Sequence, residues 1–573
     1  MSLPHLISRI SKCTKLFILS FLMLINFSIT KAQGGKTQIL DEAFKSAKER
    51  YFSFSFESRD QLNQLSKIIS IDKVEKDKVY AYASRADFDN FFNTHLDYEL
   101  LDHPNTFFHA EMFDSKLKKN YAWDQYLMYE DYVDMMYQFA NDYPAICQVF
   151  SIGKTVEGRE LLVAKISDNI DVSEAEPQFF YSGQIHGDEL VTSILMLRLI
   201  DYLTTNYGAD EQVNKLVNGI EIWINPLANP DGLYAGGNTT VNYATRFNAN
   251  SIDLNRNFPD PEDGEHPDGK SWQTETQHFM NLAEAQHFVM SANTHAGAEV
   301  VNYPWDTWTV RHADDNWWQF VSHEYADTAQ FYSPIGYMDG FDDGITNGID
   351  WYPINGGRQD YMNYFHHCRE FTLEQSTEKH ISESQLPDYW DYNRQAMLNY
   401  LEQVTYGFNG RITDLETGDP IQAKIEIDGH DFDESFVLSN QDGYYYRPIK
   451  AGLYTLNFSA DEYESVSKTN QQIADYDSKT INVQLQKLNT GIEENTISKI
   501  QITNPVHNHT LHIISSLNIK QIKIYSILGQ LIYSSQYNTK ELQIDIQNFR
   551  PGIYITKLEF SNGEHIQQRF INP

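Results

Sequence analysis

Apolar and polar positions near the start of the chain alternate in a way that predicts a small α+β unit. Alternating apolar residues predict short strands, and apolar residues at helical spacing predict the helices between them. The strands are expected at residues 51–56, 78–84 and 98–101, and the helices at residues 58–69 and 85–96. We expect residues 33–112 to form a small α+β domain that resembles a pro-domain. Its position ahead of the main domain suggests a pro-segment or a packing partner, and the sequence does not decide between them.

The longest patterned stretch, residues 113–405, alternates strand and helix signals. Its strands are apolar on both faces, which is typical of a sheet that helices cover on both sides. Leu190, Ile194 and Leu197 recur at helical spacing and give one predicted helix a buried face. The strands are expected at residues 178–186, 220–226, 287–295 and 369–374, and the long helices at residues 190–203 and 389–404. This order predicts an α/β domain with a central sheet flanked by helices.

The pattern then changes to short alternating strands separated by turn residues. Residues 406–487 are therefore expected to form a small β-sandwich. Its strand signals lie at residues 410–420, 423–429, 440–446, 451–460 and 479–486. A polar stretch at residues 488–498 predicts a linker, and residues 499–573 repeat the strand signature and predict a second all-β sandwich domain.

Charge and the first residues narrow the possible partners. The chain has 573 residues and a formal net charge of −35, so its field would repel nucleic-acid phosphates and anionic membranes. The first 32 residues combine basic residues, an apolar run and a small-residue end, which fits a secretory signal peptide cut after Ala32. The apolar run is too short for a comfortable membrane span. We therefore expect an exported protein with no membrane span and no nucleic-acid partner.

Histidines and carboxylates are the candidate metal ligands. Only Cys147 and Cys368 remain after removal of the signal peptide, and we expect them to be buried thiols, with one disulfide as the alternative. His186 and Glu189 stand three residues apart where a predicted strand ends and a helix begins, so both can point above the carboxyl edge of the sheet. A catalytic zinc ion needs three protein ligands and an open position. His295, at the end of another predicted strand, is the third candidate.

A metal site that activates water also needs a carboxylate base. Glu370 and Glu374 lie on one face of the same predicted strand, and the pattern alone does not choose between them. The segment "TRFNANSIDLNRNFPD", residues 245–260, carries two arginines and several amides in an otherwise acidic chain. Guanidinium groups bind carboxylates in a bidentate manner, so this segment is a candidate site for a substrate carboxylate.

Several short motifs occur along the chain in a specific order. They are "VEGREL", "HGDE", "NPDG", "DLNRNFPD", "THAG" with "NYPWD", "TLE", and "LPDYWDYNRQAMLNYLEQVTYGFNGRITD". This series resembles the zinc metallocarboxypeptidases, in particular the carboxypeptidase N/E and D branch, from Trp123 through the following sandwich. The resemblance implies a mixed central sheet flanked by helices and one zinc ion (Zn²⁺) per catalytic domain. It also implies that residues 406–487 form a transthyretin-like domain.

The resemblance implies a role for each residue of the metal site. His186, Glu189 and His295 would bind zinc. Asp253 would form a hydrogen bond to a ligand histidine and set its orientation. Glu374 corresponds to the general base that activates the zinc-bound water and then passes its proton to the leaving amine.

The same resemblance implies how a substrate would be held. Arg246 would polarise the scissile carbonyl and stabilise the oxyanion. Asn255, Arg256 and Tyr352 would bind the C-terminal carboxylate of the substrate. Binding at that carboxylate would explain why such an enzyme removes one terminal residue and does not cut internally.

The resembled branch has an acidic residue and a glutamine in the pocket for a C-terminal Lys or Arg. These positions fall on Asp306 and Gln359, so we expect a preference for basic residues. Arg358 replaces a residue that is usually apolar, and it would repel a cationic side chain if it faced the pocket. Asp188 stands in place of the usual Asn, and Ala296 in place of the usual Gly. Neither change removes a ligand, but each could alter the shape of the site.

We therefore expect a secreted zinc metallocarboxypeptidase that hydrolyses the C-terminal peptide bond of peptides or proteins and releases Lys or Arg. The alternatives are a zinc amidase that acts on a cell-wall or side-chain amide, and a non-catalytic peptide-binding homologue. The segment "PGIYITKLEFSNGEHIQQRFI" is similar to the C-terminal sorting domains of bacterial type IX secretion. That similarity implies the secretion machinery as a partner and a secreted or cell-surface location in a bacterium.

Overall fold

The computed structural model describes residues 40–572 except residues 43, 46, 116–120, 489–499, 505, 507, 508 and 528. The chain divides into two compact units, Met1–Lys487 and Leu488–Pro573. The predicted signal peptide at residues 1–32 and nearly all of the predicted linker at residues 488–498 lie outside the described residues. Among the helices that are described, none combines the length and the apolar character needed to cross a membrane.

The N-terminal part of the first unit is a four-stranded antiparallel sheet with strand order β2-β3-β1-β4. The elements are β1 (Glu49–Ser55), α2 (Arg59–Ser66), β2 (Ser70–Glu75), β3 (Lys78–Ser84), α3 (Arg85–Phe92), β4 (Tyr98–Leu101) and the 3₁₀ helix η3 (Pro104–Phe107). Hydroxyl groups of Ser58 and Ser84 cap the two α-helices. All the elements predicted from the pattern are present, and strand β2 was missed. A shift in register between Ile71 and Lys73 breaks its alternation.

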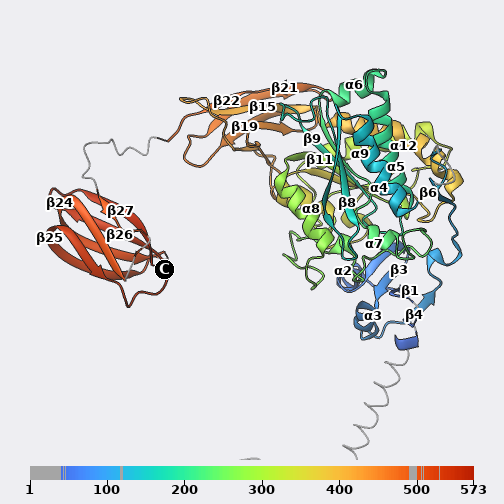
Figure 1. Ribbon diagram of the computed structural model, residues 1–573, viewed down its shortest axis with the longest axis horizontal. Helices are drawn as coiled ribbons and strands as arrows, with labels where there is room; N and C mark the ends of the chain where they lie inside the picture. The colour runs from blue at the N-terminus through green and yellow to red at the C-terminus, as the bar shows by residue number, and fades with distance from the viewer. Residues whose placement is uncertain are drawn as a thin grey trace, which may run out of the picture. The chain divides into compact units, whose positions relative to one another are not determined.

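An eight-stranded mixed sheet forms the centre of the first unit, with strand order β13-β12-β14-β11-β9-β10-β8-β7 (Figure 1). The four central strands β14, β11, β9 and β10 are parallel to their neighbours within that set. The bounds are β7 (Cys147–Lys154), β8 (Glu160–Ile166), β9 (Gln178–Gly183), β10 (Glu221–Asn225), β11 (Phe288–His295), β12 (Ala298–Tyr303), β13 (Ile345–Asn347) and β14 (Arg369–Ser376). Each predicted strand of this region corresponds to one of them, and the mixed sheet is confirmed.

Helices cover both faces of this sheet. Helices α4, α5, α6, α9 and α12 share one apolar core with it, and α8 and α11 share the other (Figure 1). The bounds are α4 (Tyr129–Asp142), α5 (Val191–Asn206), α6 (Glu211–Val217), α7 (Pro230–Leu233), η4 (Leu254–Arg256), α8 (Thr274–Ala285), α9 (Asp315–Tyr332), α10 (Gly348–Trp351), α11 (Arg358–His366), η5 (Glu383–Gln385) and α12 (Leu386–Gln403). A short parallel pair, β5 (Met112–Phe113) and β6 (Tyr126–Leu127), precedes them. Cys147 and Cys368 are buried free thiols.

Two small sheets that enclose an apolar core complete the first unit. Strands β18, β15 and β21 form one sheet, which β22 joins through β15, and strands β17, β16, β19 and β20 form the other. The bounds are β15 (Gly407–Asp414), β16 (Lys424–Ile427), β17 (Val437–Leu438), β18 (Tyr444–Arg447), β19 (Gly452–Ser459), β20 (Val466–Ile473), β21 (Ser478–Thr480) and β22 (Val483–Leu485). The sandwich is therefore all-β, as predicted.

The second unit is also all-β. Its five strands form one sheet with strand order β23-β24-β26-β27, and β25 pairs with β24. The bounds are β23 (Gln501–Ile502), β24 (Thr510–Ser526), β25 (Leu531–Asp545), β26 (Gly552–Phe560) and β27 (His565–Asn572). Alternate residues of these strands, among them Ile522, Ile524 and Leu558, form its apolar core.

Candidate metal centre and catalytic cleft

The ends of two neighbouring parallel strands, β9 and β11, position the candidate ligands. His186 and Glu189 lie in the loop between β9 and α5, and His295 is the last residue of β11, which pairs with β9. Gly187 in this loop meets the backbone of Gly232 so closely that a Cβ atom on Gly187 would lie 2.3 Å from the carbonyl carbon of Gly232. The absence of a side chain thus lets the "HGDE" and "NPDG" loops pack backbone against backbone.

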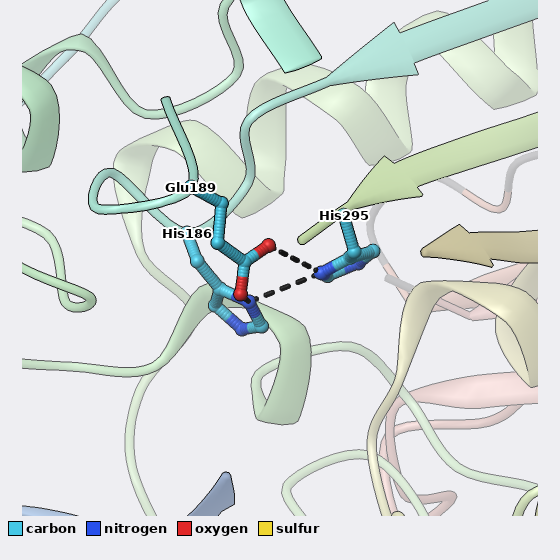
Figure 2. A group of neighbouring side chains, drawn as sticks. All are labelled: His186, Glu189 and His295. Carbon is cyan, nitrogen blue, oxygen red and sulfur yellow. Dashed lines mark hydrogen bonds and ion pairs between the residues drawn. The ribbon is translucent and has the colours of Figure 1, made fainter. Parts of the chain in front are cut away.

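The three candidate ligands form a tight buried cluster (Figure 2). His186 Nδ1 lies 2.8 Å from Glu189 Oε1, and His295 Nδ1 lies 2.9 Å from Glu189 Oε2. The two histidine Nδ1 atoms are 3.1 Å apart. One histidine nitrogen from each ring and the carboxylate therefore converge on a single point.

This donor set fits a zinc ion. Asp253 Oδ1 lies 3.1 Å from His186 Nε2, and a proton shared there leaves the Nδ1 lone pair of His186 directed into the cluster. Burial lowers the pKa of His295 to about 4, so this ring is neutral near pH 7, as a metal ligand must be. Two nitrogens and a carboxylate are the ligands that zinc prefers at catalytic sites.

The structure distinguishes the two glutamates of β14. Glu370 is fully buried and accepts hydrogen bonds from Arg358 Nη2 at 2.8 Å and from Ser291 Oγ at 2.6 Å. Glu374 pairs in register with His295, and its buried Oε2 atom has no hydrogen-bond partner among the described residues. Glu374 is thus the carboxylate that is available beside the metal cluster.

The environment of Glu374 favours proton uptake. Burial and the nearby negative charge of Glu189 raise the pKa of Glu374 well above its ordinary value. A divalent cation held by the neighbouring cluster would oppose this effect and favour the ionised carboxylate that a general base requires. The carboxyl group of Glu374 is thus favoured in its neutral form without a cation and in its ionised form beside one.

Arg246 is the cation next to the metal cluster. Its Nε atom donates to Asp253 Oδ2 at 3.1 Å, and its Nη1 atom lies 3.4 Å from Glu189 Oε1. Asp253 therefore contacts both Arg246 and His186. Burial by itself would raise the pKa of Asp253, but Arg246, His186 and Arg256 together outweigh burial and hold that pKa well below its ordinary value.

Most of the predicted site lines one small cavity, with a volume of about 20 Å³. Its lining includes the residues predicted to act in catalysis, which are the three candidate ligands, Glu374 and Arg246. It also includes the residues predicted to bind the substrate carboxylate, which are Asn255, Arg256 and Tyr352. The backbone N–H of Asn255 donates to Asp253 Oδ1 at 2.9 Å, which ties the start of this segment to the metal site.

Asp306 and Gln359 are absent from the lining of this cavity, but each forms a hydrogen bond with a residue that lines it, Asn302 and Thr372 respectively. Asp306 Oδ1 accepts a hydrogen bond from Asn302 Nδ2 at 2.9 Å, and Asn302 itself lines the cavity. A Cβ atom on Gly348 would lie 1.8 Å from the same Asp306 oxygen, so the glycine leaves room for the carboxylate. Gln359 Oε1 accepts from the backbone N–H of Thr372 at 2.7 Å. Burial raises the pKa of Asp306 to about 7.

The structure shows the contacts of the three residues that depart from the expected motifs, Arg358, Ala296 and Asp188. Arg358 forms a buried ion pair with Glu370 at 2.8 Å and lies over the ring of Phe180, and it is absent from the lining of the cavity. Its charge is therefore neutralised away from the predicted pocket. The backbone N–H of Ala296 donates to Glu189 Oε2 at 3.2 Å. Asp188 is fully buried and lies 3.7 Å from the ammonium group of Lys379.

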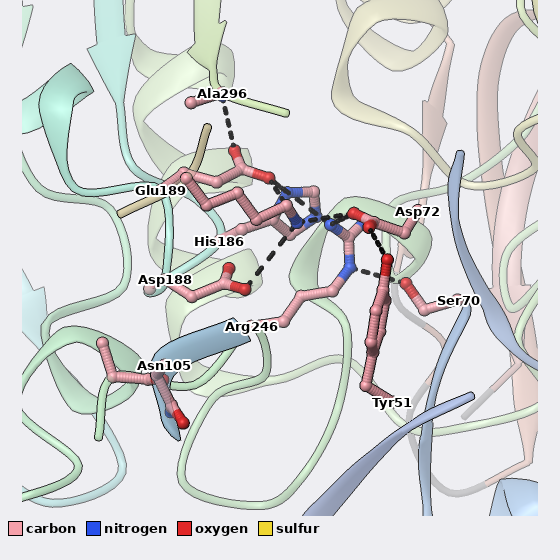
Figure 3. A network of polar contacts seen from close by, with 12 residues as sticks. Tyr51, Ser70, Asp72, Asn105, His186, Asp188, Glu189, Arg246 and Ala296 are labelled. Atoms are coloured by element: carbon pink, nitrogen blue, oxygen red, sulfur yellow. Dashed lines mark hydrogen bonds and ion pairs between the residues drawn. The ribbon is translucent and has the colours of Figure 1, made fainter. Parts of the chain in front are cut away.

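Four residues that the sequence did not single out also meet at this site, and Figure 3 shows two of them, Ser70 and Asp72. Ser70 accepts a hydrogen bond from Arg246 Nε at 2.6 Å, and Asp72 Oδ1 lies 2.7 Å from Lys379 Nζ. Glu49 accepts hydrogen bonds from the backbone N–H groups of residues 246 and 247. Three of the four come from the N-terminal sheet, where they are ordinary polar positions of strands. Only their contacts with residues far away in the sequence identify them as part of the site. The local sequence pattern does not predict such contacts.

Comparison with known proteins agrees with this geometry. A family model described as zinc carboxypeptidase matches residues 132–396. The human carboxypeptidase N catalytic chain is 34% identical over 377 residues, which cover 60% of this chain and 81% of that protein. Carboxypeptidase SOL1 of Arabidopsis thaliana is 35% identical over 352 residues, covering 60% of this chain and 69% of that one. The chain belongs to the zinc carboxypeptidase family.

Other relatives match a smaller share of their length. Mouse carboxypeptidase D is 37% identical over 347 residues, which cover 58% of this chain and 25% of that protein. The chain thus spans about a quarter of the length of this relative. The crystal structure of a carboxypeptidase A from Helicoverpa armigera matches with a TM-score of 0.48 and 17% identity, covering 62% of this chain and 97% of that one.

The end of the chain matches a second family model. Residues 503–572 match the secretion system C-terminal sorting domain. Both parts of the resemblance seen in the sequence, to zinc carboxypeptidases and to a sorting domain, are therefore confirmed. The transthyretin-like assignment of the sandwich and the roles of individual site residues remain predictions.

Proposed function

We propose that the protein is a secreted zinc metallocarboxypeptidase that removes one residue, Lys or Arg, from the C-terminus of peptides or proteins. One observation carries this proposal. A single cavity gathers a histidine and carboxylate cluster, a free carboxylate, and a separate set of arginine, asparagine and tyrosine side chains. The first two are suited to hydrolysis, and the third is suited to a terminal carboxylate.

His186, Glu189 and His295 would hold the zinc ion. Zinc bound there would supply a Lewis acid that polarises the scissile carbonyl and makes water more acidic. Asp253 would keep the His186 ring in the orientation that presents Nδ1, because it bonds to the opposite nitrogen. The remaining chemistry falls to the side chains around the cluster.

Glu374 would transfer the proton, and Arg246 would stabilise the negative charge of the oxyanion. Glu374 would accept a proton from the attacking water and then deliver it to the nitrogen of the leaving residue as the C–N bond breaks. Arg246 would stabilise the negative charge that develops on the carbonyl oxygen. Both lie in the same cavity as the cluster, which supports these roles.

The other end of the cavity would recognise the terminal residue. Asn255, Arg256 and Tyr352 would bind its α-carboxylate, and a substrate without a free terminus would leave these groups without a partner. Asp306 and Gln359 would then meet the side chain. The ion pair of Arg358 with Glu370 supports a preference for Lys or Arg, because the arginine is neutralised outside this pocket.

We also propose that the N-terminal α+β domain, predicted at residues 33–112, covers the cleft and inhibits the enzyme until it is displaced. Asp72 lines the active-site cavity and forms an ion pair with Lys379. Arg246 donates to Ser70, and Arg256 Nη2 lies 3.5 Å from the carbonyl oxygen of Ile71. Three consecutive residues of β2 thus occupy the groups that a substrate would need. This contact favours an inhibitory pro-domain over a passive packing domain.

The sorting domain supports an extracellular location. We propose that the signal peptide at residues 1–32 is removed during export, and that the secretion machinery recognises residues 499–573. The protein would then act as a secreted or cell-surface enzyme of a bacterium. Peptide C-termini outside the cell would be its substrates.

Peptide hydrolysis tests the catalytic proposal directly. A protease site introduced within residues 116–120 allows the full chain to be cut once, which keeps every domain in the sample. Peptides ending in Arg, Lys, Phe, Leu or Glu are incubated with the cut protein, and mass spectrometry follows loss of the last residue. We expect release of Arg and Lys that a zinc chelator abolishes. Glu374→Gln should lower kcat about a thousandfold because it removes the base.

Glu284→Gln, at an exposed position near the end of α8, is the matched control and should leave the rate unchanged. Release of Phe or Leu in place of Arg and Lys would reject the role of Asp306 and keep the mechanism. Hydrolysis of an internal or side-chain amide would favour the amidase alternative. Peptide binding without any release would favour the non-catalytic homologue.

A further inference from the structure

A second cavity adjoins the active-site cavity. It has a volume of about 410 Å³, and the two share Asp72 and Gly297 in their linings. None of the residues expected to bind the terminal carboxylate lines the second cavity. On the side of the catalytic domain its wall is formed by Gly297 and residues 377–380. The rest of its lining, which includes Tyr51 and Asp72, comes from the N-terminal domain. Displacement of that domain would therefore open the wall formed by residues 377–380 to the part of a peptide that precedes the scissile bond.

Lys379 is the buried cation between the two cavities. Its Nζ atom lies 2.7 Å from Asp72 Oδ1 and 3.3 Å from Glu189 Oε1. A Cβ atom on Gly297 would lie 3.2 Å from Lys379 Cε, so the glycine leaves room for the lysine stem. The backbone carbonyl of Lys379 accepts a hydrogen bond from the N–H of Leu190 at 3.1 Å, which fixes its position beside the metal loop.

The carboxylate of Asp72 indicates that the space beside Lys379 and Arg246 can bind an anionic group. Its carboxylate accepts a hydrogen bond from the Tyr51 hydroxyl at 3.0 Å, and it faces both Lys379 and, at 4.0 Å, Arg246 (Figure 3). The carboxylate comes from the N-terminal domain, whereas both cations belong to the catalytic part. Removal of that domain would leave Lys379 and Arg246 without this anion. An acidic group of a substrate can take the place of the Asp72 carboxylate.

The distance between Arg246 and Lys379 indicates which substrate residue would place its side chain at Lys379. Arg246 is expected at the scissile carbonyl, and it shares two carboxylate neighbours, Asp72 and Glu189, with Lys379. One residue of extended chain spans about 3.3–3.6 Å, so the side chain on the residue that carries this carbonyl can reach the lysine. That residue is the penultimate residue of the substrate.

We propose that Lys379 forms an anion subsite that selects peptides with Asp or Glu immediately before the terminal residue. The proposal rests on the carboxypeptidase function proposed above and adds a second specificity-determining group to it. An acidic side chain would form a charge-assisted hydrogen bond with the ammonium group. The exposed Glu378 lies at the same cavity and opposes an anion, but its carboxylate can turn to solvent.

Asp188 limits the strength of this subsite. It lies 3.7 Å from Lys379 Nζ, and neither of its oxygens has a hydrogen-bond partner among the described residues. Without Asp72, the lysine can turn toward Asp188, which then competes with the substrate. Asp188→Asn should therefore strengthen selection for an acidic residue.

The test compares two peptides that differ only in the penultimate residue, Glu or Gln, and share whichever terminal residue is released fastest. Binding is measured by calorimetry on the full chain cut within residues 116–120 and carrying Glu374→Gln, so that no turnover occurs. We expect the Glu peptide to bind about tenfold more tightly. Lys379→Gln should abolish this ratio, and Asp188→Asn should increase it. Lys215→Gln, at an exposed lysine of α6, is the matched control and should leave the ratio unchanged.

Each outcome bears on one proposal. Equal binding of the two peptides, or a ratio that survives Lys379→Gln, would overturn the anion subsite even if the enzyme releases Arg or Lys. Absence of release by the protein with Glu374 intact would reject the proposed function. The binding ratio of a Glu and Gln pair that ends in Arg would then decide the subsite. If Lys379→Gln does not fold, the intact ratio and its increase in Asp188→Asn decide it, because a subsite made by other residues would not respond to Asp188.

Discussion

At the scale of residues, identical local patterns acquire different chemistry through their partners. Glu370 and Glu374 lie on the same face of β14, yet Arg358 and Ser291 satisfy Glu370, whereas Glu374 faces the metal cluster. The sequence pattern left this choice open, and only the resemblance to a family favoured Glu374. A buried carboxylate that is already paired is a poor proton acceptor, so the partner determines the role.

Asp306 leads to a prediction about pH. Burial raises its pKa to about 7, and the neighbouring carboxylates of Asp260 and Asp360 also have raised pKa values, which burial causes in each case. Asp306 is therefore largely neutral at pH 6 and largely ionised at pH 8, and only the ionised form attracts a cationic side chain. The KM for a peptide ending in Arg should fall about tenfold over this range relative to one ending in Leu.

Steady-state kinetics of both peptides between pH 6 and pH 8 checks this prediction. Asp306→Asn should remove the difference between the two profiles. The common effect of pH on the base and the metal cancels in the ratio, because both peptides use them. A ratio that stays constant with pH in the unchanged protein would contradict the role of Asp306.

At the scale of elements, one buried acid joins three parts of the first unit. Asp314 precedes α9 and accepts hydrogen bonds from Arg369 Nη2, at the start of β14, at 2.8 Å. It also accepts from both terminal nitrogens of Arg447, on β18 of the sandwich, at 2.9 Å. The arginine charges outweigh burial and lower the pKa of Asp314, which keeps it ionised. The network thus fastens the sandwich to the strand that carries Glu374.

Asp314→Ala should destabilise the protein by about 3–5 kcal/mol, because it removes the carboxylate that the buried Arg369 and Arg447 share and leaves Arg447 with Asp431 alone. Urea unfolding, followed by tryptophan fluorescence, measures the change in the free energy of unfolding. Asp391→Ala, at an exposed position of α12, is the control and should cost less than about 1 kcal/mol. A similar small loss in both variants would show that the network contributes little to the attachment of the sandwich.

At the scale of the whole molecule, the N-terminal domain and the catalytic domain share buried surface. Tyr352 and Ile354, from the segment that would bind the substrate carboxylate, pack in the apolar core of the N-terminal sheet. Lys67 and Asp263 form an ion pair at 2.7 Å across the same contact, and Lys270 pairs with Asp87 at 2.8 Å. Displacement of the domain would free both the cations of the cleft and this tyrosine.

The intact chain should therefore be less active than the cut chain. Asp72→Asn should raise kcat/KM of the intact chain about tenfold, because loss of the ion pair with Lys379 weakens the hold on the cleft. Asp77→Asn, in the exposed turn after the same strand, is the matched control and should have no effect. Equal activity of the intact and cut chains would identify the domain as a permanent packing partner.

The sequence by itself determined the order of elements and indicated a candidate ligand set. Strand and helix periodicity is local, so β9, β11, β14 and the helices α5 and α12 could be predicted, and His186, Glu189 and His295 followed from their places at strand ends. Strand β2 could not be predicted, because its alternation is broken between Ile71 and Lys73. Only the tertiary structure decided that Arg358 neutralises Glu370 and that Asp72 meets Lys379, since these contacts join residues whose pairing no local period records.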